Sequence, residues 1–200
     1  METEIGWTRS NSRMQRMEAT LARRQPGLVL VLENVHDTHN VGAILRSADA
    51  VGIMRVMMVY YIESPPEISK NSVSGALKWL NFERFRSIQS CYEQLRADGF
   101  RILATKIEPS AQSLYDCDLT SPTAIVVGNE HRGISAEAAS GADGLLYIPM
   151  QGMVESVNVS VASAICLFEA MRQRRVAGMY DSPQLSSEIM RSELESWIQK

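Results

Sequence analysis

The sequence predicts an α/β fold built on a mostly parallel sheet, because short apolar runs alternate with helix-like segments along the chain. The runs at residues 28–33 and 123–128 are almost wholly apolar, as expected of strands that are covered on both faces. The chain has 200 residues, of which 45% are hydrophobic and 22% are charged. These values fit one globular domain with short extensions and a sizeable core.

The first 26 residues predict an amphipathic helix with one basic face. Its apolar and basic positions recur at helical spacing on different sides: Met14, Met17 and Leu21 on one, and Arg9, Arg13 and Arg16 on the other. Pro26 and Gly27 are expected to end this helix. Together with Arg23 and Arg24, the basic face fits either a solvated surface or a contact with an RNA backbone.

Later strands are expected where apolar residues cluster between turn signals, at residues 55–60, 79–85, 100–105 and 145–148. A helix is expected to begin near Asn40, which we place at its cap, and another is expected over residues 91–98. The chain closes with an amphipathic helix that is expected to pack on the core or on a partner subunit. Its apolar positions are Met190, Leu194, Trp197 and Ile198.

Residues 147–172 are the most informative stretch of the chain. A short strand is broken at Pro149 and Gly152, and a helix follows with Asn158 as its candidate N-cap. The apolar positions of this helix recur at i, i+4 and i+7, namely Val161, Ile165 and Phe168. Its first turn is small and neutral, which suits either tight packing in a core or the close approach of a flat ligand. The helix ends in a second basic cluster, formed by Arg172, Arg174 and Arg175.

Composition and charge exclude several classes of protein. The net charge of -3 argues against a protein that coats nucleic acid indiscriminately, although local basic faces remain. The chain has no apolar run of ~20 residues and no signal peptide, so we expect no membrane contact and a cytoplasmic location. Three cysteines without a C-x-x-C pair predict neither disulfides nor zinc. His36, Asp37 and His39 raise a metal site as an alternative, but no further ligand follows at a fixed spacing, so no metal is expected.

Two residues stand at the ends of expected strands, where open α/β sheets bind ligands. Thr105 ends the strand at 100–105, and Gly128 ends the strand at 123–128 and allows the backbone to turn close to a ligand. No G-x-G-x-x-G motif follows the first strand. A Rossmann dinucleotide or Rossmann methyltransferase site is therefore not supported.

Three ordered motifs resemble the signatures of the SpoU/TrmH family of RNA ribose 2′-O-methyltransferases. They are E-N-V-H-x-x-H-N-x-x-A-I-L-R at 33–46, V-G-N-E-x-x-G-I at 127–134 and I-P-M-x-G-x-x-x-S-x-N-V-S-V-A at 148–162. Residues 72–79 resemble the family's S-G-x-x-K-W element. The resemblance covers roughly residues 23–175. It implies the SPOUT fold with a deep C-terminal trefoil knot, S-adenosyl-L-methionine as cofactor and an active site that is completed across a homodimer.

The resemblance also implies a domain division and a set of site residues. The methyltransferase domain would span 27–178, between a basic helical extension at 1–26 and a helical tail at 179–200. The implied catalytic residues are Asn40, Arg46, Glu130, Ser156 and Asn158. The expected cofactor-binding residues are Thr105, Gly128, Ile148, Met150, Val157 and again Asn158. The expected RNA-binding residues are Arg9, Arg13, Arg16, Arg23, Arg24 and Arg172.

The implied reaction is transfer of a methyl group to a ribose 2′-hydroxyl, which must lose its proton. The family proposal gives that proton to Arg46, but a guanidinium stays protonated in proteins. A phosphate of the substrate is the alternative acceptor. Residues 22–26 and 176–180 resemble the branch that methylates the D-loop guanosine at tRNA position 18. The alternatives are a methyltransferase of ribosomal RNA or of the tRNA anticodon loop, and a catalytically silent RNA-binding dimer.

Overall fold

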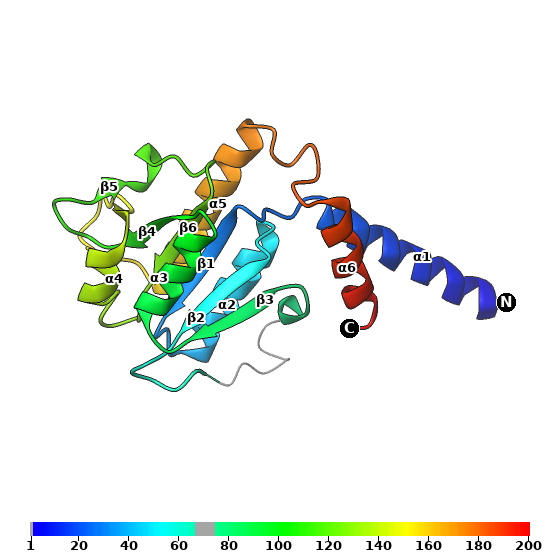
Figure 1. Cartoon of the computed structure of the whole chain (residues 1–200), viewed down its shortest axis with the longest axis horizontal. Coiled ribbons are helices and arrows are strands. Elements are labelled where there is room, and N and C mark those ends of the chain that lie inside the picture. Colours follow the sequence, from blue (N-terminus) through cyan, green and yellow to red (C-terminus); the bar gives the residue numbers. More distant parts are fainter. Residues whose placement is uncertain (1, 67–74) are drawn as a thin grey trace.

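The structure is a computed structural model that describes residues 2–66 and 75–200, with the backbone alone for residues 2–11 and 76. Its described strands form one seven-stranded sheet in the order β3-β2-β1-β6-β4-β7-β5, and every described pairing is parallel (Figure 1). The strands are β1 (Leu28–Glu33), β2 (Arg55–Val59), β3 (Asn81–Phe85), β4 (Arg101–Thr105), β5 (Gln112–Ser113), β6 (Thr123–Val127) and β7 (Gly144–Tyr147).

Helices cover both faces of this sheet. The described α-helices are α1 (Glu2–Leu21), α2 (Thr38–Ala50), α3 (Ile88–Ala97), α4 (Ala136–Gly141), α5 (Val159–Val176) and α6 (Ser187–Ile198), and the 3₁₀ turns are η1 (Ala76–Lys78) and η2 (Leu114–Asp116). Helices α2 and α5 pack on one face, and α3 and α4 pack on the other. Helices α1 and α6 lie together beyond the sheet (Figure 1).

The core follows the alternation of side chains along the strands. In β1, Leu28, Leu30 and Leu32 pack toward α2 and α5, whereas Val29 and Val31 pack toward α3. All six residues of β1 are buried, because both faces of a parallel sheet are covered. The predicted α/β class and parallel sheet are confirmed. The predicted trefoil knot stays a prediction.

Most predicted elements are present with shifted ends. The first helix ends at Leu21 and not at Pro26, so Arg23 and Arg24 lie after it. The short elements β5, η2 and α4 were not predicted, because a few residues carry too little periodicity. Of the predicted S-G-x-x-K-W element, residues 72–74 lie outside the described part of the chain. No helix within the described part combines the length and apolar character that a membrane span requires.

The cysteines have structural positions. Cys91, Cys117 and Cys166 are all free and buried. Burial raises the pKa of Cys91 and of Cys166 to about 12, so both thiols stay protonated at neutral pH. Within the residues that the structure describes, no group of three or more His, Cys, Asp and Glu residues is arranged to hold a metal ion.

The C-terminal helix packs within the chain, against the N-terminal helix, a neighbour that the sequence did not predict. Met17 and Leu21 of α1 form a small core with Met54, Leu185 and Trp197. The ring of Trp197 lies 4.9 Å from that of Trp79, with a tilt of 57°. The two chain ends are therefore joined into one helical unit.

Arg24 is a structural residue, and its predicted role in RNA binding is wrong for this structure. Its side chain is 0% exposed. It donates to Asp49 Oδ1 at 2.7 Å and to the Ile53 carbonyl at 2.7 Å, and its guanidinium lies 5.1 Å from the centre of the Trp197 ring. Basic composition indicated a surface residue, but the sequence contains no sign that α6 covers this position.

The second basic cluster also contains one buried arginine, beside two that are exposed. Arg174 is 0% exposed and donates to four acceptors, which are the Leu119, Gly27 and Ser121 carbonyls and Gln25 Oε1. Arg172 and Arg175 are exposed. Burial lowers the pKa of Arg174, yet an arginine keeps its charge under physiological conditions. Arg174 therefore ties the end of α5 to the start of β1 and to the loop before β6.

The apolar stripe predicted for α5 is divided between core and solvent: Ile165 packs against the core, but its other two members are exposed. Val161 and Phe168 are each 46% exposed, whereas the buried positions of α5 include Cys166, Leu167 and Ala170. Spacing alone cannot tell which of two apolar stripes packs on the sheet. An exposed stripe of this kind is a candidate contact surface.

Replacing Arg174 with alanine is expected to lower the free energy of unfolding by about 3 kcal/mol or more, because buried acceptors lose their donors. The measurement is equilibrium denaturation in urea. Arg175→Ala is the matched control, since Arg175 is adjacent and exposed, and it should leave stability nearly unchanged. Equal losses in the two variants would contradict the structural role of Arg174.

Candidate active site

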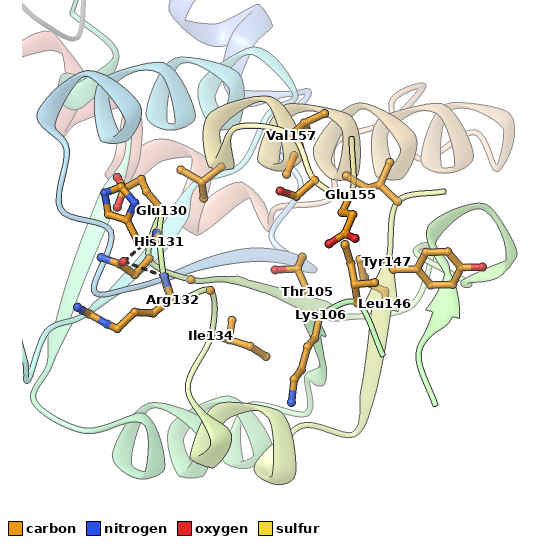
Figure 2. A pocket seen from close by; sticks show the side chains of 18 of the residues that line it. Thr105, Lys106, Glu130, His131, Arg132, Ile134, Leu146, Tyr147, Glu155 and Val157 are labelled. Atoms are coloured by element: carbon orange, nitrogen blue, oxygen red, sulfur yellow. Dashed lines mark hydrogen bonds between the residues drawn. The ribbon is translucent and has the colours of Figure 1, made fainter. Parts of the chain in front are cut away.

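A cavity of about 610 Å³ opens beyond the carboxyl ends of β4, β6 and β7, where parallel α/β sheets bind ligands. Its wall comes from the residues after each strand and from the start of α5. Figure 2 shows Glu130, His131 and Arg132 at one end of the cavity and Thr105, Lys106 and Tyr147 at the other. Five of the predicted cofactor residues line it, namely Thr105, Gly128, Ile148, Met150 and Val157.

The loop after β6 turns sharply at Gly128. A Cβ atom at this position would lie 2.1 Å from the Gly133 carbonyl carbon, so only glycine fits. Asn129 and Gly133 exchange backbone hydrogen bonds of 3.0 and 2.8 Å across this turn. The turn thereby presents Glu130 and His131 to the cavity. Glycine is required at position 128 because the backbone folds back against itself there, and not only because a ligand could approach.

Glu130 connects the loop after β6 with the start of α2. Its carboxylate accepts hydrogen bonds from the backbone N–H groups of His36 at 3.2 Å and Asp37 at 3.0 Å, and from Asn40 Nδ2 at 3.1 Å. Burial alone would raise the pKa of Glu130, but these donors outweigh it and lower the pKa below its ordinary value. Glu130 is therefore an ionised acceptor that holds its neighbours in place.

Asn40 and Asn158 join the two helices that flank the site. Asn158 Nδ2 donates to Asn40 Oδ1 at 3.1 Å, so a chain of side chains runs from Asn158 through Asn40 to Glu130. Asn158 is the N-cap of α5, as predicted, and accepts from the Ser160 N–H at 2.7 Å. The predicted cap role of Asn40 is wrong, because Asp37 caps α2 and accepts from the N–H groups of His39 and Asn40.

The side chain of Asp37 acts as the N-cap of α2. The N–H donations, from Asn40 first and then His39, lower the pKa of Asp37. Its carboxylate is thus committed to the helix start, as Asx residues at N-caps usually are. Of the three residues that raised a metal alternative, Asp37 is thus explained by its place at the start of α2.

Within one chain, Arg46 lies outside the hydrogen-bond network of Asn158, Asn40 and Glu130. It lies on the exposed side of α2, about two turns beyond Asn40, and it makes no hydrogen bond or ion pair in the described part of the chain. Neither Asn40 nor Glu130 bonds to Arg46 in the described part of the chain; they bond to one another instead. A single subunit therefore brings together four of the five predicted catalytic residues, with Ser156 in the cavity wall.

The end of β1 holds the loops around Glu130. Asn34 has a left-handed φ of 51°, and its side-chain oxygen accepts from the N–H groups of Tyr61 and Ile62. The carbonyl of Asn34 accepts from Asn129 Nδ2 at 2.9 Å. The buried carboxylate of Glu33 accepts from Tyr61 Oη at 2.5 Å and from the Ser135 N–H at 2.9 Å. These bonds tie the loops after β2 and β6 to β1.

The charges in the cavity favour a ligand with positive charge. Lys106 pairs with Glu108 at 2.8 Å, and Arg132 pairs with Glu63. Glu155 makes no ion pair or hydrogen bond in the described part of the chain, and in the view of Figure 2 its carboxylate points toward the end of the cavity that holds Thr105 and Tyr147. With both basic residues neutralised, two carboxylates remain.

The shape of the cavity also fits S-adenosyl-L-methionine. Its apolar wall is formed by Ile134, Leu146, Ile148, Met150, Val157, Val159 and Ala162, and its volume lies in the range of cofactor sites. A planar adenine suits such aliphatic surfaces, and a sulfonium and an ammonium group suit the carboxylates. Thr105 is oriented by its hydrogen bond to the Val126 carbonyl, at 3.0 Å.

The predicted RNA-binding arginines divide into three groups. Arg13, Arg16, Arg23 and Arg172 are exposed, and Arg172 forms an ion pair with Glu169 at 2.8 Å. Arg24 is buried, as described above. The side chain of Arg9 lies outside the described part of the chain. The exposed members remain available to an RNA backbone.

Sequence reasoning missed several residues around the cavity. Lys106, His131 and Glu155 line it, and Asn129 is a buried hydrogen-bonding centre, 6% exposed. A signal was present for Lys106 and Asn129, since both follow closely on the ends of strands. Nothing in the spacing of Glu155 distinguished it from other polar residues of its loop.

Comparisons with known proteins agree with this geometry. The model of the SpoU rRNA Methylase family matches residues 27–168. The tRNA (guanosine(18)-2′-O)-methyltransferase of Thermus thermophilus is 42% identical over 192 residues, which cover 96% of this chain and 98% of that protein. The Aquifex aeolicus TrmH/SpoU tRNA modifying enzyme has a similar structure, with a TM-score of 0.89 and 36% identity over 94% of this chain and 96% of that one.

The structure of a third relative contains bound S-adenosyl-L-methionine. The AdoMet-bound rRNA methyltransferase from Sinorhizobium meliloti has a TM-score of 0.67 and 27% identity, over 84% of this chain and 61% of that one. The family match spans the sheet, the cavity and most of α5. The chain therefore belongs to the SpoU methylase family.

Proposed function

We infer that the protein is a tRNA (guanosine(18)-2′-O)-methyltransferase that uses S-adenosyl-L-methionine. The observation that carries this inference is the connected set of Asn158, Asn40 and Glu130 beside a cavity into which the unpaired carboxylate of Glu155 also opens. The Thermus thermophilus relative of that name aligns over 96% of this chain and 98% of its own length. A ribosomal RNA or an anticodon-loop target is the second candidate, and a silent dimer disagrees with the assembled network.

S-adenosyl-L-methionine supplies the methyl group as a substituent of a positively charged sulfonium. The backbone around Ile148, Met150 and Val157 holds the adenosine, and Glu130 and Glu155 favour the positive charge of the bound molecule. Ser156 and Asn158 orient the ribose. Asn158 can do so because Asn40 and the start of α5 fix its amide. Positioning of this kind is a main source of catalysis in a transfer between two bound molecules.

The site is completed by a second copy of the chain. Arg46 is exposed and unpaired within the described part of one chain, and the neighbouring helix α5 exposes Val161 and Phe168. We propose that this apolar stripe forms a homodimer contact that brings Arg46 of the partner subunit to the cavity. Its guanidinium has five donors, keeps its charge and donates to a phosphate of the substrate, and that phosphate accepts the proton that the 2′-hydroxyl loses.

The remaining features fit a tRNA-modifying enzyme. We assign residues 27–178 to the methyltransferase domain, and 1–26 and 179–200 to extensions that hold tRNA through Arg13, Arg16 and Arg23. Arg172 lies at the end of α5 and offers a further exposed charge. We place the protein in the cytoplasm, where tRNA is available and where buried free thiols persist.

The target is tested by transfer of a tritiated methyl group from S-adenosyl-L-methionine to tRNA transcripts and to ribosomal RNA. Methylation of tRNA that is lost when guanosine 18 is replaced supports the inference. A label that maps to ribosomal RNA or to the anticodon loop would replace it with the second candidate. No transfer to any RNA would support a silent dimer.

Mixing two inactive variants tests whether Arg46 acts across subunits. Arg46→Ala should bind the cofactor and not methylate, and Asn158→Ala should be inactive because its own cavity is impaired. A random one-to-one mixture of both should recover about a quarter of wild-type activity, since half of the dimers are mixed and each has one intact site. No recovery after verified subunit exchange would show that Arg46 acts within its own subunit.

Glu155→Gln is expected to raise the Kd for S-adenosyl-L-methionine about tenfold, because a free carboxylate is lost beside a cationic ligand. Isothermal titration calorimetry measures this constant directly. Glu137→Gln serves as the control, since Glu137 is exposed on α4 and does not line the cavity. An unchanged Kd for Glu155→Gln would remove Glu155 from the cofactor site.

A further inference from the structure

A second cavity, of about 370 Å³, lies between the two terminal helices. Helix α1 contributes Arg13, Arg16, Met17 and Thr20, and the other walls are formed by Asp49, Trp79 and Trp197. None of these residues lines the first cavity. Figure 1 shows α1 and α6 side by side beyond the edge of the sheet.

The exposed charge of this second cavity is positive. Its one carboxylate, Asp49, is paired with the buried guanidinium of Arg24 at 2.7 Å. Arg13 and Arg16 are exposed and make no ion pair in the described part of the chain. Two uncompensated guanidinium groups at the rim of a cavity form a site for phosphate.

The inner wall is aromatic. Trp79 is only partly buried and packs against Trp197, which in turn lies beside the Arg24 guanidinium. The Arg24 hydrogen bond to residue 79 uses the backbone carbonyl, at 3.1 Å, so the indole ring of Trp79 is not required for it. Trp197 is 1% exposed, and its Nε1 is a buried donor without a partner in the described part of the chain. A ligand oxygen that reached this donor would satisfy it.

We propose that this cavity receives one unstacked nucleotide of the substrate RNA, with its base against Trp79 and its phosphate on Arg13 and Arg16. Stacking of bases on aromatic rings beside arginine is a general mode of RNA recognition. The volume suits one nucleotide. The proposal rests on the proposed function, because it takes RNA as the substrate. An RNA nucleotide is favoured over a free one, since Arg23, two residues after the end of α1, is a further exposed arginine outside the cavity.

The test separates stacking from charge by the salt dependence of RNA binding. Trp79→Leu should weaken binding of the methylated RNA about tenfold and leave the slope of log K against log salt unchanged. Trp79→Phe retains a ring and should bind nearly as wild type. Arg16→Ala should weaken binding and reduce that slope by about 1. Arg191→Ala, on the exposed side of α6, is the charge-matched control and should have little effect.

Ultraviolet crosslinking of the wild-type protein to the RNA gives a second readout that needs no variant. We expect a nucleotide on the peptide that contains Trp79. Wild-type affinity of Trp79→Leu, or loss of affinity in Trp79→Phe equal to that in Trp79→Leu, would overturn the proposal. Binding of free guanosine monophosphate as tight as that of RNA would also overturn it.

Cofactor affinity separates this test from the test of the function. All four variants should bind S-adenosyl-L-methionine as wild type does, because the first cavity is unchanged. If transfer assays identify ribosomal RNA as the substrate, the same comparison is made with that RNA. The two proposals can therefore fail independently.

Discussion

Acceptance of three hydrogen bonds by the Glu130 carboxylate is the interaction on which the site depends. Two of the donors are backbone N–H groups of the loop after β1, and the third is the Asn40 amide. Because Asn40 also contacts Asn158, one carboxylate aligns the starts of α2 and α5. The lowered pKa of Glu130 reflects the same donors and keeps this acceptor ionised across the neutral range.

The parallel sheet makes this interaction possible. All carboxyl ends of its strands meet at one edge, so loops that are far apart in sequence become neighbours. Glu33 and Asn34 use this proximity to hold the loops after β2 and β6. Buried and fully hydrogen-bonded polar groups of this kind specify one arrangement of the loops. The unpaired carboxylate of Glu155 and the backbone at Gly128 then line the cavity that we propose for the cationic cofactor.

The terminal helices extend the protein away from that edge and use arginine in two ways. Arg24 and Arg174 are buried and join segments of the core through carbonyl and carboxylate acceptors. Arg13, Arg16 and Arg23 are exposed. They give this part of the chain a local positive charge, although the net charge of the whole chain is -3. One residue type thus stabilises the core where it is buried and, under the proposed function, contacts RNA where it is exposed.

The sequence by itself determined the α/β class, most strands, five residues that line one cavity, and the family, because apolar periodicity and ordered motifs are local signals. It also placed Asn158 at its cap. Tertiary structure alone decided that Arg24 is buried, that Val161 and Phe168 face outward, and that Asp37 rather than Asn40 caps α2. Burial depends on which distant segment covers a side chain, and neither α6 over Arg24 nor the loop of Glu130 beside Asn40 is encoded in local spacing.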